Sequence, residues 1–350
     1  MPGRPPITSR KGVRQSLPWT ALSDDELLHL KFSDLKLRLP GSRLEKSLRR
    51  IYDELKSRGI TFRPHMWLAE EWFSPDGVPG IAVPFYLAHP RLMHLEYRMM
   101  KQVEGGNDNW MMRILRHEAG HAVDTAFRLR RRARWREAFG PASLPYPDSY
   151  QVRPGSRRYV QHLGDWYAQS HPTEDFAETF AVWLTPRSNW RRTYDAWPVR
   201  NKLERVEELM REVASGPALV TSRRHVEPLS SNSRTLAQHY VEKLRRQEAW
   251  RNETADGLML RVFAPPTTLE MPRASAFLRS NHRSLVDTVS RISGADRYTL
   301  HQVLRIAIHR CDELDLRLRA GARASLPHVR WLLGGMVQTL DRGARPKLNL

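Results

Sequence analysis

Cysteine is nearly absent from this chain of 350 residues, which contains Cys311 alone. A disulfide within the chain is therefore excluded, and such sparse cysteine usage is typical of a reducing compartment. No stretch approaches the roughly 18 apolar residues that a transmembrane helix needs. Residues 1–19 hold basic residues and prolines but lack the apolar segment of a secretory signal. These absences predict a cytoplasmic protein without a membrane span.

Acidic residues are also scarce: 38 Asp and Glu stand against 57 Lys and Arg, so the net charge is +19. Nine arginines fall in the block Arg128–Arg158, together with only Glu137 and Asp148. Such a block can attract phosphates or an acidic substrate, or it can be an arginine-rich loop that faces water. Because zinc-finger spacings and RNA-recognition aromatic motifs are missing, the block allows a nucleic-acid partner without requiring one.

The chain does contain a metal-binding pattern, His117-Glu118-Ala119-Gly120-His121. Two histidines four residues apart lie on one face of an α-helix, where both imidazoles can bind one zinc ion. The glutamate between them can reach a metal-bound water. Apolar residues recur around the pentad with helical spacing, at positions 111, 115, 119, 122 and 126. The alternative is a pair of core histidines on an amphipathic helix, without a metal.

A zinc site needs a third protein ligand, and its identity separates the classes of zinc enzyme. A metzincin would place a histidine six residues after His121, but Phe127 stands there. Asp124 lies too close along the same helix to be a comfortable ligand, so we expect it to orient another group or to cap. The metzincin class is therefore excluded, and the third ligand has to come from another segment.

A second helix is predicted between Pro172, which suits a first turn, and Pro186, which stops the helix. Glu174 and Glu178 share one face of it, and the other face is apolar, with Phe176, Phe180, Trp183 and Leu184. Two carboxylates on an otherwise apolar helix are costly to bury unless they are paired. A metal ion and a ligating histidine would pair with both, whereas the alternative is an acidic edge that faces water.

The pentad and the stretch 167–178, which reads YAQSHPTEDFAE, together resemble the bacterial zinc-binding metallopeptidases of the gluzincin type. In that family an HExxH helix is followed by a Ser-His-Pro-x-Glu-Asp-aromatic-Ala-Glu helix. The resemblance covers roughly residues 20–215. It implies a zincin-like domain with Glu174 as the third ligand of the zinc ion and Glu178 as the partner of a ligating histidine.

These residues predict a peptidase that binds one zinc ion per chain and hydrolyses a peptide or protein substrate. Glu118 is the expected general base, because zinc lowers the pKa of a bound water to about 7 and a neighbouring carboxylate can take its proton. Tyr167 or His171 is expected to stabilise the tetrahedral intermediate, although His171 can equally cap its helix. Glu178 or Asp124 would hold the second nitrogen of a ligating histidine.

Two other functions remain open at this point. The chain could be a basic nucleic-acid-associated protein that carries a zincin domain, or a zinc-stabilised binding module without turnover. A peptidase predicts proteolysis that depends on Glu118, nucleic-acid association predicts affinity that falls steeply with salt, and a binding module predicts tight zinc without cleavage.

The predicted fold class is α+β, with a small mixed sheet packed on the HExxH helix and a mainly helical C-terminal domain. Residues 60–69 and 80–88 are the expected strands. Pro84 favours an edge position for the second strand, where an extended peptide could add to the sheet. We therefore expect residues 80–88 to line the substrate cleft, and the alternative is an ordinary buried hairpin.

The chain is predicted to divide into five segments: a flexible basic arm (1–20), a zincin-like metallopeptidase domain (21–215), a linker (216–234), a helical accessory domain (235–341) and a tail (342–350). Serine, glycine and proline mark the linker. The accessory domain carries no metal-ligand or nucleophile pattern, and we expect Cys311 to be a small buried residue within it.

Overall fold

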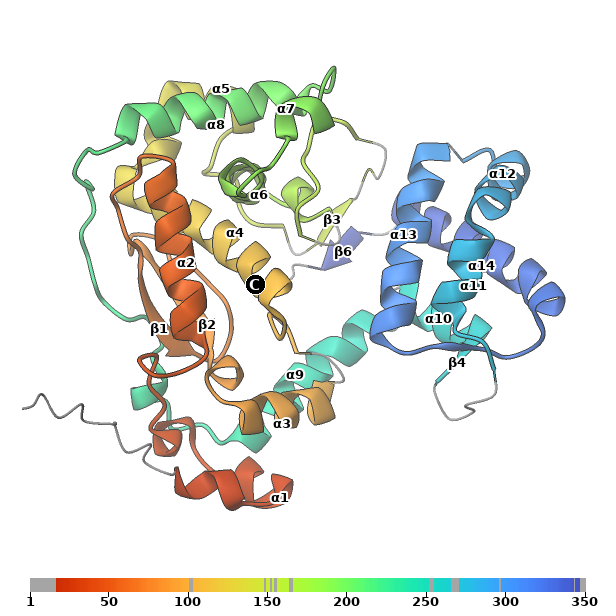
Figure 1. Cartoon of the computed structure of the whole chain (residues 1–350), viewed down its shortest axis with the longest axis horizontal. Helices are drawn as coiled ribbons and strands as arrows, with labels where there is room; N and C mark the ends of the chain where they lie inside the picture. The colour runs from red at the N-terminus through yellow and green to blue at the C-terminus, as the bar shows by residue number, and fades with distance from the viewer. Residues whose placement is uncertain are drawn as a thin grey trace, which may run out of the picture.

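The computed structural model describes residues 17–100, 103–147, 149–151, 153, 156–163, 166–251, 255–265, 271–295, 297–342 and 344–346. Within these ranges the chain is mostly helical and forms three two-stranded sheets. This agrees with the α+β class predicted from the sequence. Two large apolar cores are present, and Figure 1 shows the C-terminal helices as a group to one side of the remaining elements.

The first core is built by residues from Trp19 to Tyr240, and the second mainly by residues from Met259 to Val337. The helices around the first core are α1 (Asp24–Leu28), α2 (Leu44–Ser57), α3 (Pro90–Met100), α4 (Asp108–Phe127), α5 (Ala133–Phe139), α6 (Pro172–Leu184), α7 (Trp190–Thr193), α8 (Val199–Val213) and α9 (Leu236–Arg251). Those around the second core are α10 (Ala255–Val262), α11 (Ala274–Ser280), α12 (His282–Ser293), α13 (Arg297–Glu313) and α14 (Ala322–Arg342). The strands are β1 (His65–Ala69), β2 (Gly80–Pro84), β3 (Ser149–Gln151), β4 (Phe263–Ala264), β5 (Arg317–Leu318) and β6 (Ala344–Pro346).

Helix α4 carries the pentad through the first core. Its N-cap is Asn107, whose side chain accepts a hydrogen bond from the backbone N–H of Trp110. Its C-cap, Arg128, adopts a left-handed conformation with φ 51°, which ends the helix before the arginine-rich segment.

Helix α6 lies against α4 and is buried from Thr173 to Leu184. Pro172 stands in its first turn, as predicted, and His171 is its N-cap. Gly120 allows the two helices to approach closely, because a Cβ there would lie 3.0 Å from the Cα of Ala177. This close approach brings one face of α4 against the first turn of α6.

Strands β1 and β2 form a parallel pair, with His65 opposite Gly80. All five residues of β2 are buried, and on its other side the backbone N–H of Ala82 donates to the carbonyl of Phe73 at 2.8 Å. Phe85–Ala88 form a 3-10 helix rather than the end of a strand. The parallel order rules out the alternative of a hairpin, and the pairing on both sides of β2 argues against the expected free edge that lines a substrate cleft.

The predicted segment boundaries differ from the limits of the first core at two points. Most of the predicted basic arm, residues 1–16, and residues 343 and 347–350 of the predicted tail lie outside the described residues. Trp19, which the prediction placed in the arm, is buried in the first core, and its indole N–H donates to the carbonyl of Leu35. Leu236 and Tyr240 of α9 also belong to the first core, so the apolar cores do not separate at residue 235.

Two further features concern the chain as a whole. Cys311 is buried in the second core, as expected of a small apolar residue. Among the described residues, no helix combines the length and the apolar character that crossing a membrane requires.

Candidate metal centre

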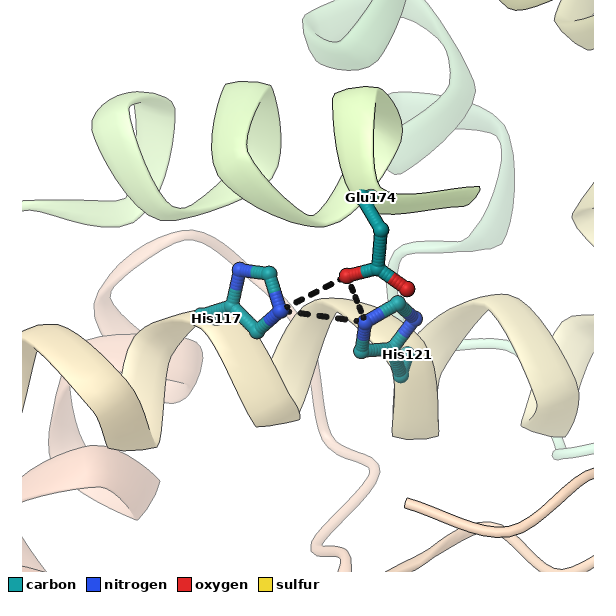
Figure 2. Close-up of side chains that lie close together, drawn as sticks. All are labelled: His117, His121 and Glu174. Carbon is teal, nitrogen blue, oxygen red and sulfur yellow. Dashed lines mark hydrogen bonds and ion pairs between the residues drawn. The ribbon is translucent and has the colours of Figure 1, made fainter. Parts of the chain in front are cut away.

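Three side chains from α4 and α6 converge on one point (Figure 2). The Nε2 atoms of His117 and His121 are 3.1 Å apart, and each lies 3.1 Å from Oε2 of Glu174. His117 and Glu174 are buried, and 12% of the His121 side chain is exposed. Around a tetrahedral zinc ion with bonds of ~2.0–2.1 Å, ligand atoms lie about 3.3 Å apart. The spacing and the donor types therefore fit zinc.

The tautomer of His117 also fits a metal ligand. Its Nδ1 lies 2.9 Å from Oε1 of Glu178, and the other carboxylate oxygen of Glu178 accepts a hydrogen bond from the backbone N–H of Leu163 at 2.8 Å. Because a carboxylate only accepts, Nδ1 donates to Glu178, and Nε2 is the nitrogen that faces His121 and Glu174 and could bind a cation there. This is the arrangement in which an outer carboxylate orients a ligating imidazole.

The electrostatics of the cluster favour a positive charge at this point. Burial lowers the pKa of His117, but hydrogen bonds to the Glu174 and Glu178 carboxylates outweigh it and raise that pKa to about 10. Burial alone would raise the pKa of Glu174, yet the two histidines hold it well below its usual range. Two buried carboxylates beside two imidazoles thus favour a cation at this point.

Glu118 lies between the two histidines on α4 and is 1% exposed. Its Oε2 is buried and has no hydrogen-bond partner among the described residues. Its backbone carbonyl accepts a hydrogen bond from the hydroxyl of Ser74 at 3.2 Å. A buried carboxylate oxygen without a partner is costly, so this atom is suited to a water molecule or a substrate group beside the three converging side chains.

Tyr167 lies beside the cluster, with its ring centroid 5.6 Å from that of His117. Burial and the nearby Glu174 carboxylate raise the pKa of the Tyr167 phenol well above its usual value, so the hydroxyl keeps its proton and can donate. Tyr167 therefore lies beside His117, and its role as an electrophilic donor stays a prediction from the sequence.

His171 has a different environment. Its Nδ1 accepts a hydrogen bond from the backbone N–H of Thr173 at 3.2 Å, which caps α6, and its Nε2 lies 2.9 Å from the carbonyl of Leu144. A carbonyl only accepts, so Nε2 carries the proton and both ring nitrogens are engaged. The geometry thus favours the capping role over the catalytic one.

Tyr146 is a site residue that the sequence reasoning missed. Its hydroxyl donates to Oε1 of Glu174 at 2.7 Å, also contacts the Thr173 hydroxyl, and its ring stacks on His171 with centroids 3.8 Å apart. Burial and the Glu174 carboxylate raise the pKa of this phenol, which favours the donor form. The only sequence signal is a tyrosine between two prolines, Pro145 and Pro147. The contact follows from the path of a loop rather than from any spacing.

Asp124 is buried on α4 but faces another partner. Its two oxygens accept hydrogen bonds from the backbone N–H and from Nε of Arg130, at 2.8 Å and 2.6 Å. Arg130 also binds Asp76 through Nη1. Asp124 therefore anchors the segment that follows α4, whereas the hydrogen bond to a ligating imidazole comes from Glu178.

Several arginines of the basic block are neutralised by acidic neighbours. Besides Arg130, both Arg132 and Arg134 form ion pairs with Glu212 on α8, at 2.7 Å each. These pairs attach the block to the first core. A role of the remaining arginines in binding nucleic acid stays a prediction from the sequence.

A comparison with known families agrees with this site. Residues 107–223 match the model of a family described as putative zinc-binding metallo-peptidase. The match begins at the N-cap of α4 and ends beyond α8, so it contains both metal-binding helices. No curated protein and no solved structure matches the chain. Residues 107–223 thus match the zinc-binding metallo-peptidase family that the sequence resembles.

Proposed function

We propose that this protein is a zinc-dependent peptidase of the gluzincin type, with one zinc ion held by His117, His121 and Glu174. The observation that carries the proposal is the pairwise 3.1 Å convergence of these three ligand atoms, together with the unpartnered, buried Oε2 of Glu118 on the helix that carries both histidines. A structural zinc site commonly closes with four protein ligands, whereas a catalytic site combines three ligands with an open position and a nearby base. The family match at residues 107–223 supports the same function.

Each residue around the centre has a role that follows from its contacts. When bound, zinc would act as a Lewis acid and make a water molecule nucleophilic near neutral pH. Glu118 would take the proton of the attacking water and pass it to the leaving amine. Tyr167 would donate a hydrogen bond to the oxyanion that develops on the peptide carbonyl.

The remaining residues hold the ligands in place. Glu178 orients His117 through Nδ1, and the Tyr146 hydroxyl holds the outer oxygen of Glu174. His171 supports Tyr146 by stacking and caps the helix that presents Glu174. Such fixed ligands keep the geometry of a metal site within narrow limits.

The decisive experiment compares Glu118→Gln with Glu174→Ala. We expect Glu118→Gln to keep one equivalent of zinc and to lose about 10²–10⁴-fold in peptide cleavage, because the amide cannot accept the proton. Glu174→Ala should lose zinc itself, since only two ligands remain. Metal analysis and cleavage of a mixed peptide library provide the readouts. Cleavage that persists in Glu118→Gln would disprove the assigned base, and full zinc retention in Glu174→Ala would disprove the third ligand.

A further inference from the structure

Strand β3 is linked to the metal centre through the residues on both sides of it in the chain. The loop that leads into it carries Tyr146, whose hydroxyl binds Glu174 at 2.7 Å. Just after it, the backbone N–H of Arg153 donates to the Gln169 side chain at 2.8 Å, and that side chain donates back to the Arg153 carbonyl at 3.0 Å. These bonds hold β3 against the 3-10 helix Tyr167–Gln169. The segment that contains β3 is therefore held at one end to the third ligand and at the other to the helix of the candidate electrophile.

The backbone of β3 is paired with the far end of the chain. Strand β6 runs antiparallel to it, with Tyr150 opposite Arg345 and Gln151 opposite Ala344. Figure 1 shows the two short strands between α6 and the C-terminal helices. Pairing of this kind depends on the main chain, so an extended peptide of almost any sequence can take the place of β6.

The second core holds β6 in this position. Tyr150 of β3 and Trp166, which precedes Tyr167, are buried in the second core together with residues of α14. Helix α14 ends at Arg342, directly before β6. The segment is thus tethered next to β3, and a tethered strand competes with free peptides at a high effective concentration.

We propose that β3 is the strand that binds the substrate backbone, and that β6 occupies it as an intramolecular strap that restrains access to the metal centre. The inference rests on the proposed peptidase function and concerns the regulation of that site. Strand β2 does not offer the same surface, because β1 and Phe73 bond to its two edges. The substrate is accordingly an extended peptide that adds to β3 by main-chain hydrogen bonds.

The test uses zinc-loaded protein that ends at Arg342. This truncation removes the strap but leaves every described residue of the second core in place, since that core ends at Val337. A strap that covers β3 for about 90% of the time would reduce activity about tenfold, so we expect the truncated protein to cleave a generic peptide about tenfold faster than the full chain. Equal rates would overturn the proposal.

Two variants of the full chain distinguish the effect of main-chain pairing from that of the Arg345 side chain. Arg345→Pro removes the N–H opposite Tyr150, whereas Arg345→Ala keeps it. We expect Arg345→Pro to gain activity as the truncation does and Arg345→Ala to stay close to the wild-type rate. An equal gain in both variants would contradict main-chain pairing.

A binding measurement works even if the protein is not a peptidase. A labelled synthetic peptide of residues 341–350 is titrated into Glu118→Gln protein, truncated at Arg342 or full-length. We expect the truncated form to bind at least about tenfold tighter, because its β3 is not occupied by the strap. Binding without any proteolysis in wild type would support the strap and reject the proposed function. Proteolysis with no difference in peptide binding would do the reverse.

Discussion

The close approach of α4 and α6 at Gly120 predicts that one methyl group will weaken the metal centre. In Gly120→Ala the new Cβ would lie 3.0 Å from the Cα of Ala177 and 3.2 Å from Cδ1 of Phe180, where ordinary contacts begin at 3.4 Å. The first neighbour is backbone and cannot rotate away. The helices must therefore separate by about 0.4 Å, in the same turn of α4 that carries both histidines.

The magnitude follows from two opposing effects. Replacing glycine by alanine inside a helix stabilises it by about 0.5–1 kcal/mol, because the unfolded chain loses freedom. Overpacking of a tight interface costs about 1–3 kcal/mol. Gly334→Ala in α14 is a matched control, since a Cβ there meets nothing within 4 Å. We expect the free energy of unfolding of Gly120→Ala to lie about 1–3 kcal/mol below that of Gly334→Ala.

Zinc binding should report the same strain. Two ligands lie on α4 and the third on α6, so a bound ion holds together the helices that the methyl group separates. If about 1.4 kcal/mol of the strain opposes binding, zinc affinity falls about tenfold. Urea unfolding with and without zinc, and competition with a chelator, measure both quantities. Equal stability of the two alanine variants together with unchanged zinc affinity would refute the reasoning.

Two further predictions concern single carboxylates. Glu178→Gln should lower zinc affinity about 10–100-fold in chelator competition, because an amide cannot accept from both His117 and the Leu163 N–H as the carboxylate does; an affinity within twofold of wild type would contradict the orienting role. Burial, mainly, raises the pKa of Glu104 from 4.5 to about 7, so the folded state favours the protonated form and stability is lost as the pH rises between these values. Relative to Glu104→Gln, the wild type should lose about 3 kcal/mol of unfolding free energy from pH 4.5 to 7, and parallel curves in urea titrations at several pH values would exclude this.

Short-range patterns in the sequence were sufficient to predict the two histidines as a pair on one helix and a second helix with two candidate carboxylates. The four-residue spacing of His117 and His121 requires only a helix, and a helix is set by local hydrogen bonds and apolar periodicity. Pro172 marks the start of α6 for an equally local reason. The pairing of two buried carboxylates predicted a cation partner, and the family resemblance selected Glu174 from the two.

The surroundings of the site depended on contacts between distant segments. Tyr146 reaches Glu174 through a loop without a periodic pattern, so no spacing could reveal it. Asp124 was expected to hold a ligating imidazole. The chain turns back after α4, however, and Arg130 donates hydrogen bonds to both oxygens of Asp124. Turns of this kind depend on the packing of the whole core, which local propensity does not encode.

By itself, then, the sequence predicted the two helices that carry the converging side chains and the α+β class, and it named Glu118 as the candidate base. Only the tertiary structure decided which carboxylate orients His117, which tyrosine touches Glu174 and which strand is linked to the centre. The β1–β2 pair shows the difference clearly: the apolar segments at 60–69 and 80–88 predicted the strands, yet their parallel order and the pairing on both sides of β2 followed from packing. Local patterns set the elements because their hydrogen bonds are short in range, whereas pairing between elements is settled by the burial of the shared core.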